Sequence, residues 1–120
     1  MPLVEVFGFN SFKNEEVTKK TFNTVVKNAV SSHKDMGLRP YQVSMVHHND
    51  CDDMDDTLII TIGGLFVKKT RTLAVQNATC KKVAKEIVRL LKFHEQPILI
   101  EVWVRPLDTK KAGFVEWRPK

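Results

Sequence analysis

The sequence predicts an α/β (α+β) domain in which two βαβ units form a four-stranded mixed sheet with two helices on one face. Three observations predict it: the element order is β-α-β-β-α-β, the two halves are similar in size, and 120 residues suit one hydrophobic core. We expect one domain over residues 1–120, with pseudo-repeats at about 2–48 and 57–105 and a C-terminal tail at 106–120.

The first half is predicted to be strand, helix, strand. Residues 3–7 are rich in β-branched side chains and stop at Gly8, which indicates a strand at the start of the chain. Apolar residues recur at helical spacing over 14–34, which indicates a helix. A strand at 41–47 follows Pro40.

The second half repeats this order. Residues 57–62 are almost continuously apolar, which favours a central strand buried on both faces, and the glycines at 63–64 are expected to end it. An amphipathic helix is predicted at 72–93 and a fourth strand at 98–104. Residues 113–117 form a short edge strand or an ordered tail in this interpretation.

Composition limits the classes of protein that fit. Hydrophobic residues at 42% and charged residues at 28% are typical of a folded globular chain. No apolar run approaches the about 20 residues of a membrane span, and no secretory signal is visible at the N-terminus. Two cysteines fit a reducing compartment, so a cytoplasmic location is expected. The net charge of +5 favours anionic partners, either small substrates or nucleic acid.

Pro2 is the most informative candidate for chemistry. Because proline is a small penultimate residue, we expect removal of Met1, which leaves a secondary amine at the start of a strand. An α-amino group titrates near about 7.7 to 8.0, and burial or nearby cations lower this pKa. Such an amine can act as a general base near neutral pH.

Short motifs occur in a specific order along the chain. They are Met-Pro at the start, His33-Lys34, Asp56 to Ile60, Lys68-x-x-Arg71-Thr72 and Val115-Glu116-Trp117. Together they resemble the tautomerase superfamily, with the 4-oxalocrotonate tautomerase and macrophage migration inhibitory factor fold, and most of all its cis-3-chloroacrylic acid dehalogenase group. Arg39-Pro40-Tyr41-Gln42 is similar to a segment of macrophage migration inhibitory factor, with Arg39 in place of an active-site lysine.

The resemblance implies a cofactor-independent tautomerase or isomerase that acts on small 2-keto, enol or unsaturated carboxylic acids. The catalytic residues it implies are Pro2, Arg71, Glu116 and His33, and the substrate-binding residues are Lys68, Arg39, Ile62, Glu101 and Trp103. It also implies no cofactor, no metal and a homotrimer with sites at subunit boundaries. Whether Pro2 acts as base or acid stays open.

Each implied role has a simpler structural alternative. Arg71 and Lys68 would clamp a carboxylate, or lie in a solvated basic loop. His33 would face inward and bind the substrate, or interact with a helix dipole. Glu116 would activate water, or lie on an exposed tail. Ile62 would line the site near Pro2, or pack in the core.

One departure from the dehalogenase group argues against tight positioning of a carboxylate, and another argues against efficient dehalogenation. Lys68 stands where that group has an arginine, and Glu101 stands near the place of its water-activating tyrosine. We therefore expect Glu101 or Trp103 to line the pocket instead. Packing alone is the simpler account of Trp103.

Other functions remain as alternatives. One is a hydratase or dehalogenase of 3-substituted acrylates that uses the same site, and another is a non-catalytic signalling or binding member. An RNA-binding βαββαβ module is disfavoured, because residues 57–62 lack the aromatics of an RNP1 strand. Metal binding is also disfavoured, because the adjacent His47 and His48 point to opposite faces of a strand.

Overall fold

The computed structural model describes residues 2–9, 18–48, 57–91 and 99–107. Its elements are β1 (Leu3–Phe7), α1 (Lys19–Ser31), the 3-10 turns η2 (Lys34–Met36) and η3 (Pro40–Gln42), β2 (Ser44–His48), β3 (Thr57–Phe66), α2 (Leu73–Leu91) and β4 (Leu99–Leu107). Within these residues, neither helix is long and apolar enough to cross a membrane.

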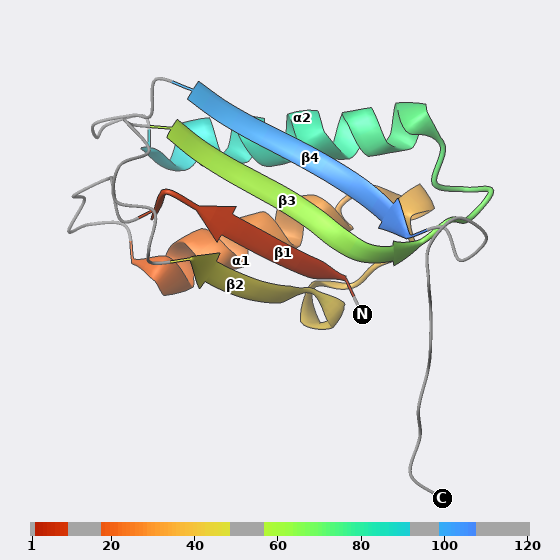
Figure 1. Ribbon diagram of the computed structural model, residues 1–120, viewed down its shortest axis with the longest axis horizontal. Helices are drawn as coiled ribbons and strands as arrows, with labels where there is room; N and C mark the ends of the chain where they lie inside the picture. The colour runs from red at the N-terminus through yellow and green to blue at the C-terminus, as the bar shows by residue number, and fades with distance from the viewer. Residues whose placement is uncertain (1, 10–17, 49–56, 92–98, 108–120) are drawn as a thin grey trace, which may run out of the picture.

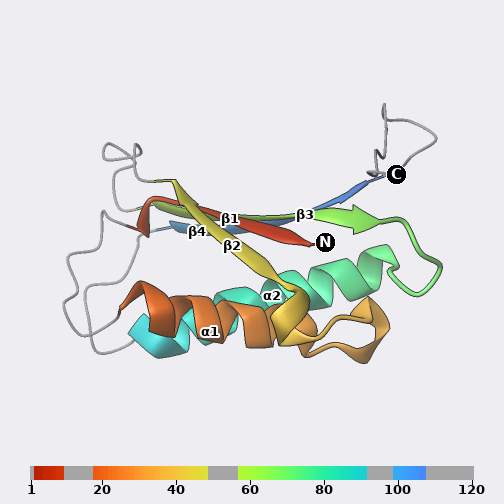
Figure 2. The same cartoon turned by 90° about the horizontal axis from the view of Figure 1, so that it is seen from below.

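The four strands form one mixed sheet in the order β2-β1-β3-β4. β1 pairs with β2 in parallel and β3 pairs with β4 in parallel, while β1 and β3 pair antiparallel. Both helices cover the same face of the sheet (Figures 1 and 2). The predicted fold is therefore confirmed: two βαβ units share one four-stranded mixed sheet, and both helices lie on one side of it.

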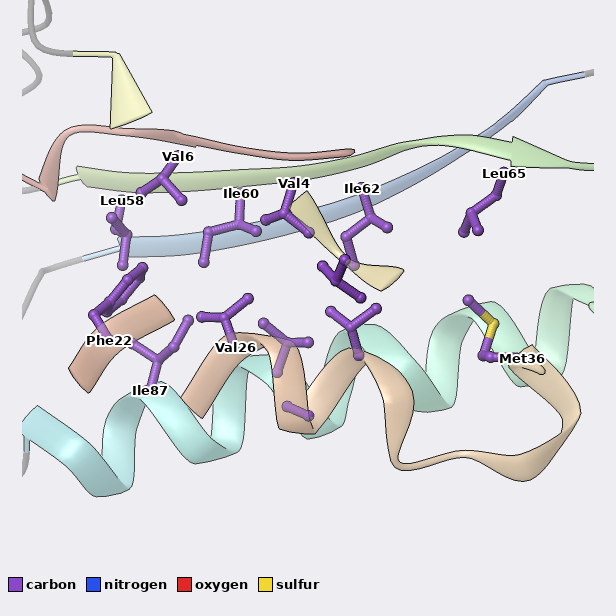
Figure 3. Close-up of a cluster of buried hydrophobic side chains, with 14 of the residues drawn as sticks. Val4, Val6, Phe22, Val26, Met36, Leu58, Ile60, Ile62, Leu65 and Ile87 are labelled. Carbon is purple, nitrogen blue, oxygen red and sulfur yellow. The ribbon is translucent and has the colours of Figure 1, made fainter. Parts of the chain in front are cut away.

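The core lies between the sheet and the helices, and two periodicities produce it. Alternate strand residues point to the helices, and apolar residues three or four apart form one stripe on each helix. The fully buried members include Val4, Val6, Leu58, Ile60 and Ile62 from the strands, Phe22, Val26 and Val30 from α1, and Val83 and Ile87 from α2 (Figure 3). This layer fixes which strand side chains face away from the helices.

The predicted end of β3 was wrong. Gly63 and Gly64 do not end the strand, which continues to Phe66 through an irregularity in its pairing with β4 between Ile62 and Leu65. Gly64 has a φ of 72°, a conformation that a residue without a Cβ adopts at little cost. The expected burial on both faces holds only in part, because on the side away from the described helices Thr61 is buried whereas Ile59 is half-buried.

The chain between α1 and β2 also differs from the prediction. α1 ends at Ser31, because the hydroxyls of Ser31 and Ser32 bond carbonyls of the preceding turn, at 2.8 Å to Lys27 and 2.7 Å to Ala29. β2 begins at residue 44 rather than 41, since Pro40 opens η3. The predicted helix start at 14 and the strand at 113–117 lie outside the described residues.

Candidate active site

Pro2 is buried at the start of β1, between the two neighbouring strands. Its carbonyl accepts a hydrogen bond of 3.0 Å from the backbone N–H of Ser44, and the next residue, Leu3, pairs with Ser44 on β2 and Gly63 on β3. The backbone of Pro2 is thus held by the sheet from its first peptide unit. A proline amine in this place would sit at a fixed point of a rigid element.

The predicted cations gather at the same end of the sheet as Pro2. Because β3 runs antiparallel to β1, the loop that leaves β3 lies at the end where β1 begins, and the η2–η3 segment lies there too (Figure 2). This places Lys68 and Arg71 on one loop and Arg39 on the other. Lys68 and Arg39 are both exposed. Positive charge is therefore available near the N-terminus of β1.

Arg71 is buried, with 9% of its surface exposed. Its Nε donates a 2.9 Å hydrogen bond to the carbonyl of Met36, and its own carbonyl accepts a 3.0 Å bond from the side-chain amide of Gln76. Burial lowers the pKa of this guanidinium, although arginine remains protonated at neutral pH. The bond to Met36 joins the loop before α2 to η2, so Arg71 holds these two segments together.

His33 does not take the inward position expected from helical spacing. α1 ends two residues before it, and His33 instead caps η2, where its Nδ1 accepts the backbone N–H of Asp35 at 3.2 Å. The carboxylate of Asp35 lies 4.0 Å from the same nitrogen. The ring is half-buried, and its Nδ1 is occupied by the turn that it caps.

Ile62 is fully buried and faces the helices, in register with Val4 of β1. Figure 3 shows it above the helices, beside other core side chains. The core role considered for this residue therefore matches its position. Glu116, the predicted water-activating carboxylate, lies outside the described residues.

Glu101 and Trp103 line a groove of about 470 Å³ between β4 and α2. Leu73, Gln76, Asn77, Cys80, Val102 and Val104 complete its lining. Cys80 was expected in the core, but it is only half-buried here, and burial raises the pKa of its thiol. The expectation that Glu101 and Trp103 line a pocket thus holds for this groove, but Pro2 is not among its lining residues.

The strand register separates this groove from Pro2. Trp103 pairs with Thr61, and Thr61 pairs with Glu5, so Trp103 lies two strands and three residues away from Pro2. With about 3.3 Å per residue and 4.8 Å per strand, the backbone separation is on the order of 14 Å. A small acid bound at Pro2 does not reach Trp103 of the same chain, and Glu101 is farther still.

Two polar pairs that involve histidines of β2 were not predicted from the sequence. His47 points to the helix side, where its Nε2 lies 2.6 Å from Oδ1 of Asn23, and burial together with Lys19 lowers its pKa. His48 points to the other side, where its Nε2 lies 3.1 Å from Oε1 of Glu5. The predicted opposite directions of the two histidines are confirmed. Their partners lie far away in sequence, so no local signal pointed to them.

No protein-family model and no curated protein matches the sequence. Among solved structures, a fused 4-OT wild-type symmetric trimer matches with a TM-score of 0.64 and 11% identity, over 93% of this chain and 90% of that one. A member of the cis-3-chloroacrylic acid dehalogenase family matches with a TM-score of 0.59 and 11% identity, over 98% and 84%.

A 5-carboxymethyl-2-hydroxymuconate delta-isomerase also matches, with a TM-score of 0.55 and 11% identity, over 98% of this chain and 89% of that one. The chain has the tautomerase fold. Its resemblance in fold to the tautomerase superfamily, expected from short motifs, is thus confirmed over nearly the whole chain. At identities this low the likeness concerns the fold, and the activity has to be argued from the residues at the site.

Proposed function

We propose that this protein is a cofactor-independent tautomerase that uses the nitrogen of Pro2 on small 2-keto or enol carboxylic acids. One observation carries the proposal: Pro2 is buried immediately before an inner strand, in a fold shared with 4-OT and an isomerase. The proposal requires removal of Met1, because only then is this nitrogen a basic amine rather than an amide.

The proposed chemistry is a proton transfer within one substrate. A neutral Pro2 nitrogen takes the proton of the enol hydroxyl, and the protonated amine returns a proton to the neighbouring carbon, so the enol becomes the ketone with no net change in atoms. Burial at the strand start and the cations at this end both disfavour the charged amine. The neutral amine is the form that can act as the base in this step.

The substrate carboxylate would be bound by the exposed cations at the same end, Lys68 and Arg39. Arg71 adds charge to this region, while its Nε bond to Met36 holds the Lys68 loop in place. Lysine provides a point charge rather than a planar fork, so carboxylate binding through Lys68 would tolerate several orientations. This arrangement suits a broad class of small acids.

We also propose that the active form is a homotrimer whose sites lie at subunit boundaries. The face of the sheet away from the described helices, together with its β4 edge, carries the exposed apolar residues Val46, Leu99 and Trp103. Leu99 and Trp103 lie on β4 at one edge of the sheet and Val46 on β2 at the other, and exposed apolar side chains of this kind are typical of interfaces. Light scattering should give three times the chain mass of 13.8 kDa, and a monomer at micromolar concentration would contradict the proposal.

The activity is tested by following ketonisation of phenylenolpyruvate in the ultraviolet. Protein shown by intact mass to lack Met1 is compared with a Pro2→Ala variant and with a form that carries a Gly-Ser extension before Pro2. The extension is the matched control, because it keeps every side chain and converts only the amine into an amide. We expect activity in the first protein alone. Equal rates in all three would refute catalysis by the amine.

A further inference from the structure

Charge is divided between the two sides of the sheet. α1 and α2 contain seven basic residues and one acid, Glu86, a net charge of +6 against +5 for the whole chain. The charged residues of the four strands, histidines aside, are Glu5, Glu101 and Arg105. Both helices cover one face of the sheet (Figure 2), so the net positive charge of the helices lies on that side.

The basic helix face is defined here by Lys20 and Lys27 of α1 and by Lys81, Lys85 and Arg89 of α2. All but the half-buried Lys27 are exposed. On α2 these residues recur every four positions, opposite the buried stripe that contains Val83 and Ile87. They therefore form a row along the outside of the helix rather than a scattered set.

The one acid on these helices leaves most of this charge uncompensated. Glu86 lies 3.1 Å from Nζ of Lys82 and 3.4 Å from Nη1 of Arg89, and these neighbours lower its pKa, so it is ionised at neutral pH. Within the described residues, the ion pairs place no carboxylate against Lys81 or Lys85. At least these two cations are available to an external anion.

The spacing of the row suits a polymer of phosphates. Lys81, Lys85 and Arg89 span about 12 Å along the helix axis at 1.5 Å per residue. Along one strand of a duplex the phosphates are spaced by about 3.4 Å of axial rise, so the row faces three to four of them. Lys20 and Lys27 of the neighbouring helix flank Asn23, which contacts His47 of β2, so they extend the positive charge toward the β2 edge rather than along this row.

The other side chains on this face argue against binding of a membrane or of single-stranded nucleic acid. Among the described residues of the two helices, the exposed large hydrophobics are Leu73 and Val88, and no aromatic residue is among them. A membrane-bound helix would present a broad apolar face, and a single-stranded nucleic acid would require aromatic stacking. A duplex backbone requires cations alone.

We propose that the basic helix face binds the phosphate backbone of double-stranded nucleic acid without reading its sequence. This surface is separate from the Pro2 end and differs from the disfavoured RNA-binding sheet, because it uses helices and charge rather than strand aromatics. The three to four phosphates that the row faces correspond to a slope of about −3 in the plot of log affinity against log salt concentration.

The test measures fluorescence anisotropy of a labelled DNA duplex with full-length protein between about 50 and 200 mM salt. Lys85→Gln should reduce the slope by about 0.9 and Lys81→Gln/Lys85→Gln by about 1.8. Arg105→Gln is the matched control, because it removes one positive charge from β4 and should leave the slope unchanged. Circular dichroism and the thermal midpoint establish that the variants are folded.

Three results would overturn the proposal. An equal loss of slope in Arg105→Gln would mean that net charge alone attracts the duplex. Tighter binding to single-stranded oligothymidine than to duplex would indicate a stacking surface elsewhere. Binding to phosphatidylserine vesicles but not to duplex would assign the helix face to membranes. Ketonisation of phenylenolpyruvate should be the same in Lys81→Gln/Lys85→Gln and the unmodified protein, which separates this proposal from the proposed catalysis.

Discussion

Protonation of His47 should destabilise the folded protein. The ring lies between β2 and α1, with the rings of Phe9 and Phe22 at 5.3 and 5.8 Å. The 2.6 Å contact with Oδ1 of Asn23 uses Nε2 as donor, and Nδ1 is buried without a hydrogen-bond partner within the described residues. A proton added at Nδ1 would bring a charge into this apolar pocket beside Lys19, which is why the pKa is lowered.

The sign and the limit of this effect follow from linkage. With the folded pKa below the unfolded value of about 6.5, the unfolded chain binds more protons, so stability falls as the pH drops below about 6.5. The slope is at most about 1.4 kcal/mol per pH unit, which gives a loss of at most about 1.4 kcal/mol between about pH 7.5 and 5.5. Because His47 is only half-buried, screening by water makes the real loss smaller.

Urea unfolding at fixed protein concentration and a series of pH values measures this loss. His47→Gln keeps an amide donor for Asn23 and removes the titration, so its curves should lose the part of the pH dependence that belongs to His47. His48→Gln is the control, because His48 lies on the opposite face of β2 beside Glu5. The reasoning is refuted if His47→Gln keeps the full pH dependence below about pH 6.5.

Three further substitutions test the packing of the core, the backbone of β3 and the loop before α2. Ile62→Ala should lower the free energy of unfolding by about 2–5 kcal/mol in urea titrations, since the side chain is fully buried. Gly64→Ala should cost about 1 kcal/mol in the same assay, because a Cβ is strained at a φ of 72°. Arg71→Met should cost about 1–3 kcal/mol by leaving the Met36 carbonyl without its Nε donor; an unchanged midpoint would show that this bond is not needed.

The sequence predicted the core and the pairing of the halves better than the ends of elements. Period-two and period-3.6 patterns identify which side chains are buried, because burial repeats with the geometry of the element itself. The end of α1 escaped prediction, because the serine bonds that compete with the last turn depend on side-chain rotamers. The passage of β3 through Gly64 depends on pairing with β4, a partner distant in sequence.

The candidate site was predictable only in part for a similar reason. Lys68 and Arg71 were assigned to the site from the resemblance, and the antiparallel pairing of β1 with β3 brings their loop to the end of the sheet where β1 begins. The distance from Pro2 to Trp103 depends instead on the register of β1 with β3 and of β3 with β4. No local pattern contains that register, so residues that the resemblance groups into one site lie far apart in one chain.

The distance between Pro2 and Trp103 within one chain bears on how copies of the chain would associate. Trp103 is 52% exposed and Leu99 48% exposed, so β4 presents apolar surface that a second copy could cover, and only a second copy could bring such a residue near another chain's Pro2. The helix side is charged instead and is suited to anions. Association through apolar contacts is insensitive to moderate salt, whereas phosphate binding weakens steeply with it. Raising the salt should therefore release a duplex from the helices while it leaves the proposed trimer intact.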